Sequence, residues 1–222
     1  MTGEGAHLLR GLRAKRIAEE GLRAEIMRGA VAPGQWLVEP ELGERYGVTR
    51  NSARLALDSL ITEGLVERIP NRGARVRAVS PAEAVAVLEC RQVLDGLLAG
   101  KAAQNATDGR ADDLRRNLLR MQRAVAAEEL LECSALVREH HRLVRELADQ
   151  PMASALVAQL EGRTVRHEFQ LLLRPGQAGR AVAGLAHVVD AVGERQADSA
   201  EAAARAHLQE LVDALSAELV GA

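Results

Sequence analysis

The sequence is poor in aromatic residues, since Trp36, Tyr46 and Phe169 are the only three among 222 residues. A core must therefore be built from leucine, valine and alanine, which suits closely packed helices. Lysine is nearly absent as well, because Lys15 and Lys101 are the only two. Arginine thus carries almost all the positive charge, and we draw no function from that bias.

Cysteine and long apolar runs are also scarce. Cys90 and Cys133 are too few for a disulfide framework and are typical of small buried hydrophobic residues. No apolar run approaches the roughly 20 residues that a helix needs to span a bilayer, and no secretory signal is recognisable. We therefore expect a cytoplasmic protein without a membrane partner.

The charge that is present is divided unevenly along the chain. The formal net charge is -2, but residues 1–80 hold 13 basic and 10 acidic residues, and residues 81–222 hold 16 and 21. Within residues 45–77 there are seven arginines and three acids. A local basic segment of this kind is typical of contact with nucleic acid.

The same basic segment has the punctuation of two short helices joined by a turn. Residues 41–46 can form one short helix, and Gly47 after it supplies the positive φ that a tight turn needs. Thr49 suits the N-cap of the second helix. Its predicted buried face follows the i, i+4, i+7, i+8 pattern, namely Ala53, Leu57, Leu60 and Ile61.

Polar residues with nucleic-acid chemistry lie at the start of the second helix, opposite the apolar face. Arg50, Asn51 and Arg54 can each make the hydrogen bonds that read base edges in the major groove. Residues 65–68 and 74–77 then read as two short strands, whose arginines suit a phosphate backbone or the minor groove. Together these elements predict a winged helix-turn-helix that binds DNA.

A specific family pattern runs through this region, carried by Ile26, Gly29, Pro33-Gly34-Gln35, Leu37, Glu39, Glu41-Leu42, Arg45 to Arg50, Arg54, Ala56-Leu57, Leu60, Glu63 to Val66 and Gly73. Through these residues the segment 16–78 resembles the winged helix-turn-helix of the GntR family of bacterial transcription regulators. The resemblance implies operator contacts by Arg50, Arg54 and the wing around Gly73, which includes Asn71. Thr49, Asn51 and Arg72 are the implied helpers.

Two departures from the family pattern affect operator sequence. Many relatives have Thr-Pro before the second arginine and an acid after it, where this chain has Asn51-Ser52 and Leu55. Pro40 replaces a basic residue often found in the short helix. The operator sequence of relatives therefore does not transfer, although DNA binding does.

The remainder of the chain reads as helix after helix. We expect a disordered tail over residues 1–7, the DNA-binding domain over 8–78, a linker over 79–82 and a helical domain over 83–222. Ser80, Pro81 and Glu83 form a capping box at the start of that domain. Turn residues leave six helical segments, which predict an antiparallel bundle: 82–105, 110–126, 129–148, 152–173, 177–195 and 199–220. The fold class is thus mainly α, with three helices and a β-hairpin wing followed by the bundle.

Three histidines of the bundle lie on predicted apolar faces, namely His141, His187 and His207. A single histidine so placed is usually a core residue, but three imidazoles can hold one face of a zinc or nickel ion. Periodicity alone does not show that the three converge.

A second resemblance bears on these histidines. Residues 83–220 resemble the FadR-like C-terminal (FCD) domain, through Leu88 to Arg91, Ala106 to Asp108, His141 to Leu143, the His187 segment and Ala203 to Leu208. It implies a divalent metal, of zinc or nickel type, on His141, His187 and His207 that helps to hold a small carboxylate. The acid that many members place four residues before the first histidine is here Val137. The alternative is a metal-free pocket whose imidazoles bind an anion directly.

These features predict a homodimeric transcription regulator and not an enzyme, and the family resemblance implies a repressor. We expect it to bind a palindromic operator and to respond to a small organic acid in the helical domain. Arg91 is a candidate partner of the effector carboxylate, with a salt bridge as the other interpretation. Two further functions stay open: a metal-dependent hydrolase using the three histidines, and a ligand-independent DNA-binding protein.

Overall fold

The computed structural model describes the backbone of residues 3–221 and the side chains of residues 11–217. The chain divides into two compact units. The first comprises Met1–Val79 with Glu161–Arg166, and the second comprises Ser80–Leu160 with His167–Ala222. The division between Val79 and Ser80 lies inside the segment expected to be a linker.

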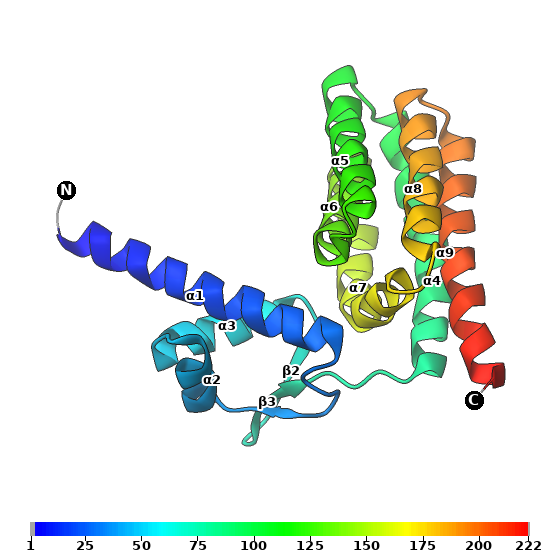
Figure 1. Ribbon diagram of the computed structural model, residues 1–222. Helices are drawn as coiled ribbons and strands as arrows, with labels where there is room; N and C mark the ends of the chain where they lie inside the picture. The colour runs from blue at the N-terminus through cyan, green and yellow to red at the C-terminus, as the bar shows by residue number, and fades with distance from the viewer. Residues whose placement is uncertain (1–2, 222) are drawn as a thin grey trace. The chain divides into compact units, whose positions relative to one another are not determined.

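The first unit combines three helices with a small sheet. Its elements are α1 (Gly3–Arg28), β1 (Trp36–Leu37), α2 (Glu39–Tyr46), α3 (Arg50–Thr62), β2 (Val66–Ile69) and β3 (Gly73–Val76) (Figure 1). The sheet is antiparallel with β3 in its centre, between β1 and β2. Its core is aliphatic, as the composition requires, and includes Leu22, Ile26, Leu57, Leu60, Val66 and Val76.

Two features of this unit differ from the sequence-based expectation. Helix α1 begins at Gly3, so residues 3–7 are helical where a disordered tail is expected, and residues 1–2 lie outside the described residues. Extending a formed helix adds one hydrogen bond for each residue fixed, which favours such an extension. The strand β1 is also additional, and it pairs Trp36 with Arg75 and Leu37 with Ala74.

The second unit is built of helices joined by turns in its described residues. These helices are α4 (Pro81–Gln104), α5 (Asp108–Ala126), α6 (Leu130–Ala148), α7 (Pro151–Leu172), α8 (Gln177–Gly193) and α9 (Ala197–Gly221) (Figure 1). The segment Glu161–Arg166 of α7 is grouped with the first unit. Helix α4 packs along α9 and also contacts α6 and α8, while α5 packs against α6 and α8. The predicted bundle and its six helical segments therefore match the structure.

Capping explains where the bundle begins. The Ser80 hydroxyl accepts a hydrogen bond from the backbone N–H of Glu83 at 3.1 Å, and Pro81 occupies the first helical turn. Proline is tolerated there because its missing N–H would have no intrahelical partner. The predicted N-cap at Ser80 is therefore confirmed.

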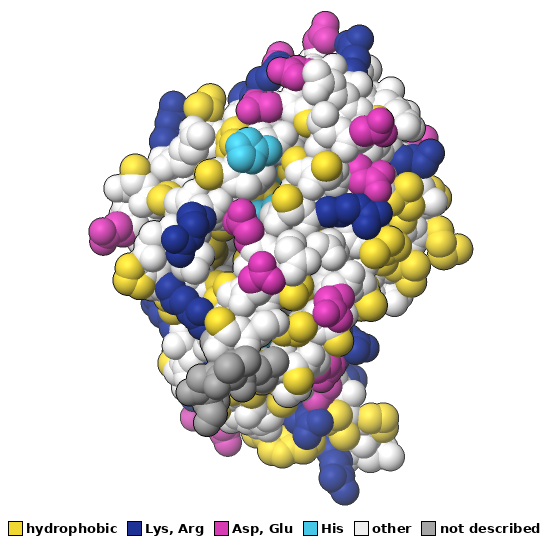
Figure 2. All heavy atoms as spheres, turned by 90° about the vertical axis from the view of Figure 1, so that its right-hand side faces the viewer, with side chains coloured by type: hydrophobic (Ala, Val, Ile, Leu, Met, Phe, Trp, Pro, Cys, Tyr) yellow, Lys and Arg dark blue, Asp and Glu magenta, His cyan; other side chains and the backbone are white. Residues whose placement is uncertain are grey.

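The surface in Figure 2 mixes charges of both signs, and hydrophobic side chains gather along its right-hand edge. Histidine side chains are visible in the upper half of that face (Figure 2). No helix in the described part of the chain is long and apolar enough to cross a membrane.

Candidate nucleic-acid interface and histidine cavity

Helix α3 has one buried face and one exposed polar face. Its buried positions are Ser52, Ala53, Ala56, Leu57 and Leu60. Ala53, Leu57 and Leu60 were predicted to be buried, whereas the predicted Ile61 is only half-buried. Arg50, Asn51 and Arg54 are all exposed. The structure therefore places together, on the first turns of one helix, the three side chains that the sequence selects for base contacts.

The turn before α3 fixes the direction in which this face points. Gly47 has φ 63°, and its left-handed conformation ends α2. Thr49 then accepts a hydrogen bond from the backbone N–H of Ser52 at 3.1 Å, and its hydroxyl lies 3.0 Å from that of Ser52. The Thr49 hydroxyl is thus engaged in capping the helix, where it satisfies a backbone donor.

Both arginines of the exposed face contact acceptors of the protein itself. Arg50 Nε donates to Glu39 Oε2 at 3.0 Å, and Arg54 Nη2 donates to Asn51 Oδ1 at 2.9 Å. Asn51 is therefore engaged with Arg54 in the protein without DNA. The sequence indicates both arginines but not the acceptors that hold them.

The hairpin between β2 and β3 exposes the predicted wing residues Asn71, Arg72 and Gly73. Asn71 has φ 61°, and the backbone N–H of Arg72 donates to the carbonyl of Ile69 at 3.0 Å to close the turn. Asparagine is among the few non-glycine residues that adopt this conformation readily. The turn leaves the Arg72 side chain at its exposed tip.

The arginines further down the wing are paired with acids. Arg68 lies 2.6 Å from Asp58, and Arg75 lies 2.6 Å from Glu67 with its guanidinium 5.9 Å from the Trp36 ring. Such partly exposed pairs contribute about 0–1 kcal/mol each. Their acids also offset part of the positive charge of the wing. Arg50, Arg54 and Arg72 are the candidates for DNA contact because they are exposed at the start of α3 and at the hairpin tip, although Arg50 too is paired with an acid, Glu39.

A small cavity in the second unit contains the histidines that the structure does bring together. It measures about 30 Å³ and is lined by residues of α4, α6, α8 and α9, among them Asp95, His140, His141, Arg145, Leu185, Val188 and His207. A cavity of this size holds about one or two water molecules. His140, which is not among the three predicted ligands, also lines the cavity.

Burial keeps two of these imidazoles neutral. It lowers the pKa of His207 to about 3, with a smaller contribution from His141, and lowers the pKa of His140 well below its ordinary value. Within the described part of the chain, the buried Nδ1 atoms of His140 and His207 have no hydrogen-bond partner. Two polar atoms that lack partners are costly inside a protein, so a bound ligand or water would stabilise them.

The close fit around His207 depends on Gly184. A Cβ atom at that position would lie 2.8 Å from His207 Nδ1, so only glycine lets α8 approach the imidazole this closely. The backbone of α8 therefore forms part of the wall around the imidazole.

The structure does not bring the three predicted metal ligands together. His187 is exposed on α8 and does not line the cavity. It lies two positions after Leu185, or about 200° around the helix, and shares its exposed side with Ala183. No group of three or more His, Cys, Asp or Glu side chains among the described residues could hold a metal ion. Val137 supplies no oxygen either, so these residues do not fit the metal.

Arg91 does not lie where a contact with the effector carboxylate would place it. Its side chain is fully buried, with Nη1 2.6 Å from Glu168 Oε1 and Nε 3.2 Å from Asp95 Oδ2. It does not line the cavity, whose wall instead contains its partner Asp95. The alternative interpretation as a salt bridge therefore describes Arg91, although within the protein rather than on its surface.

Comparisons with known proteins agree with both halves of this description. Residues 14–76 match the model of bacterial regulatory proteins of the gntR family, and residues 86–210 match the FCD domain. The HTH-type transcriptional repressor RspR of Escherichia coli K12 is 26% identical over 194 residues, which cover 87% of this chain and 85% of that protein.

Two further relatives cover a similar extent. An HTH-type transcriptional regulator from an unstable DNA locus of Streptomyces ambofaciens is 30% identical over 193 residues, covering 86% of this chain and 80% of that protein. The solved structure of E. coli McbR/YncC superposes with a TM-score of 0.73 at 17% identity, covering 93% of this chain and 98% of that one. The last comparison supports the fold.

Proposed function

The chain belongs to the GntR family of bacterial regulatory proteins and is a DNA-binding transcriptional regulator with an FCD domain, and we propose that it is an effector-responsive repressor acting as a homodimer. The related RspR is named a transcriptional repressor, which supports the direction of regulation. Family membership separates the chain from the hydrolase alternative.

The exposed polar face of α3 is the observation that supports operator reading by Arg50 and Arg54. Arginine can form paired hydrogen bonds to guanine, and such a contact discriminates by about 1–3 kcal/mol against the wrong base. The exposed Arg72 at the hairpin tip suits a phosphate contact, which adds affinity without sequence preference.

Binding to a DNA duplex selected from a random library by the wild-type protein tests this assignment. Arg54→Ala should weaken binding to the selected duplex about 5- to 150-fold and relax the preference at one base position. Arg16→Ala is the control, because Arg16 is an exposed arginine of α1 that is paired with Glu20. Equal affinities of wild type and Arg54→Ala would remove α3 from the operator contact.

A second copy of the chain is the partner that operator symmetry requires, because two recognition helices on one face of DNA need half-sites about one turn apart. Helix α4 offers a surface for it. Ala86, Cys90, Val93 and Leu97 are exposed at spacings of four, three and four residues, and we call this row the α4 stripe. Such spacing is typical of a helix face that packs on another helix.

The cavity around His140 and His207 supports a metal-free effector site for a small organic acid. The two buried Nδ1 atoms offer hydrogen bonds, and Arg145 in the wall offers positive charge. Because the cavity holds only one or two waters, a ligand has to separate α4, α6, α8 and α9 to enter. That separation is the proposed source of coupling between effector and DNA.

Thermal unfolding in the presence of a panel of small organic acids tests the effector site. An acid that binds the folded protein at 100 times its dissociation constant adds about 2.7 kcal/mol of stability and raises the melting temperature. The increase should disappear in His207→Leu and persist in His187→Ala and in the presence of a metal chelator. Loss of the increase in His187→Ala or with chelator would instead favour the metal centre.

A further inference from the structure

The hydrogen bond between Arg50 and Glu39 joins the start of α3 to the start of α2. Arg50 Nε lies 3.0 Å from Glu39 Oε2, and the two residues are 11 positions apart in the chain. The side chain of Glu39 is 22% exposed and that of Arg50 is 75% exposed. The acceptor is therefore the better anchored of the two groups, and the guanidinium extends from it toward solvent.

Glu39 stands on a helix whose position is fixed by packing. Glu39 begins α2, whose Leu42 and Gly43 are buried, and α2 packs directly against α3. The backbone N–H of Val48 donates to the carbonyl of Gly43 at 2.9 Å, which ties the connecting turn to α2. The backbone positions of Glu39 and Arg50 are thus fixed relative to each other.

The use of Nε by Glu39 leaves particular donors of Arg50 available. A guanidinium has five N–H groups, of which Nε carries one and the two terminal nitrogens carry four. The terminal pair is the fork that matches two acceptors of a guanine edge or a phosphate. An arginine held at Nε presents this fork with less conformational freedom to lose when it binds.

We infer that Glu39 is a positioning residue, which orients Arg50 for base reading and so sets operator selectivity rather than overall affinity for DNA. This inference rests on the proposed operator contact of Arg50. The carboxylate also places a negative charge beside a DNA-binding arginine, which opposes binding to DNA of any sequence. Glu39 therefore raises discrimination while lowering non-specific affinity, and these two effects have opposite signs.

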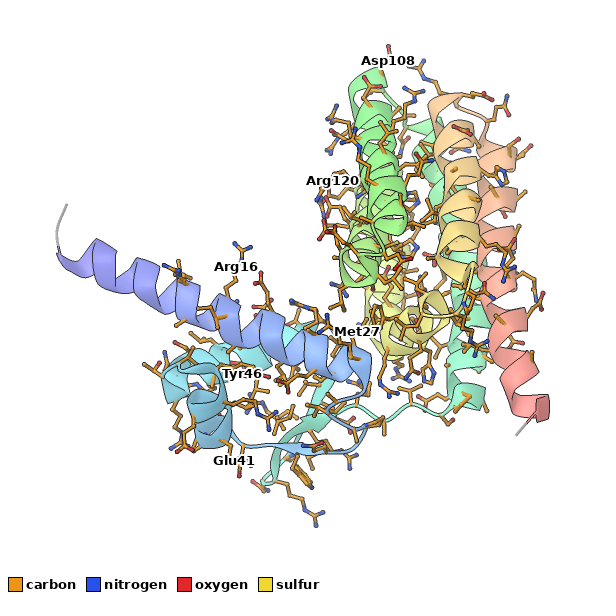
Figure 3. All side chains as sticks on the ribbon, viewed as in Figure 1. Arg16, Met27, Glu41, Tyr46, Asp108 and Arg120 are labelled. Atoms are coloured by element: carbon orange, nitrogen blue, oxygen red, sulfur yellow. The ribbon has the colours of Figure 1, made fainter. Side chains whose placement is uncertain are left out.

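Glu41 provides a matched control on the same helix turn. Both acids lie in the first turn of α2, so removal of either has the same effect on the charge at the helix start. Glu41 is exposed, and Figure 3 shows it on the outer side of α2. Its replacement changes the charge without changing the acceptor of Arg50.

The experiment measures affinity for a duplex selected by the wild-type protein and for a shuffled duplex of the same composition. Glu39→Ala should lower the ratio of the two affinities about three- to fivefold, with shuffled-duplex binding at least as tight as in wild type. Glu39→Gln, which keeps an oxygen acceptor, should restore most of the ratio. Glu41→Ala should leave the ratio within about twofold of wild type.

A double-mutant cycle shows whether Glu39 acts through Arg50. In an Arg50→Ala background, Glu39→Ala should not lower the ratio further. A ratio that is unchanged in Glu39→Ala, or lowered equally by Glu41→Ala, overturns the inference while the Arg50 contact stands. An unchanged ratio in Arg50→Ala alone overturns both, and equal loss of both affinities with a lower melting temperature would show a structural role.

Discussion

At the scale of single residues, His207 links the cavity to the pH dependence of stability. Its pKa in the folded protein is about 3, lowered mainly by burial, whereas an unfolded histidine titrates near 6.5. Between these values the unfolded chain binds a proton that the folded chain does not. The free energy of unfolding should therefore fall by about 1.4 kcal/mol for each unit by which pH drops below 6.5.

Urea unfolding of wild type and His207→Leu at pH 7, 6 and 5 measures this contribution. The decline toward pH 5 should be smaller in the variant. His187→Leu, the same replacement at an exposed position outside the cavity, is the control that should follow wild type. Leucine also removes a buried polar atom that lacks a partner, which changes stability by the same amount at every pH. The test therefore compares how steeply the free energy of unfolding changes with pH in the two proteins, not its absolute value. Parallel pH curves for wild type and His207→Leu would contradict the assignment of a neutral buried imidazole.

The same residue scale shows how far the sites could be predicted from sequence. Arg50 and Arg54 were predictable because helical spacing separates them from the apolar face of α3. His187 was misplaced because Ala183, its neighbour one turn away, is small and apolar yet exposed. An alanine does not tell a buried face from an exposed one. The role of Glu39 depends on a contact across a turn, which periodicity does not show.

At the scale of elements, local signals predicted the helices well and the sheet only in part. Thr49 and Ser80 mark helix starts because a side-chain hydroxyl accepts from a backbone N–H three residues on, a contact set by neighbouring residues. The two hairpin strands were also predictable from local sequence. The observed bounds of each strand differ from the predicted ones by one residue at each end. Strand β1 has two residues and pairs with β3 almost 40 positions away. Its formation depends on that distant partner, which leaves no local pattern.

At the scale of the whole molecule, the proposed dimerisation through the α4 stripe gives the last prediction. Val93 is 52% exposed and Leu97 is 38% exposed, and Leu119 on α5 is a control of the same character at 51%. Val93→Glu with Leu97→Glu should give a monomer by sedimentation, because two facing copies would bury four like charges, whereas Leu119→Glu should remain a dimer.

The affinity of the monomeric variant for operator DNA then measures how much dimerisation contributes to binding. Two linked reading helices bind with a gain of about 10²- to 10⁴-fold over one, so the monomeric variant should lose affinity for a two-site duplex by that order. Its affinity for a duplex with one half-site should stay close to wild type, because the face of α3 is unchanged. A dimer that persists in the double variant would place the interface elsewhere, and a monomeric variant with full two-site affinity would show that the two copies bind DNA independently.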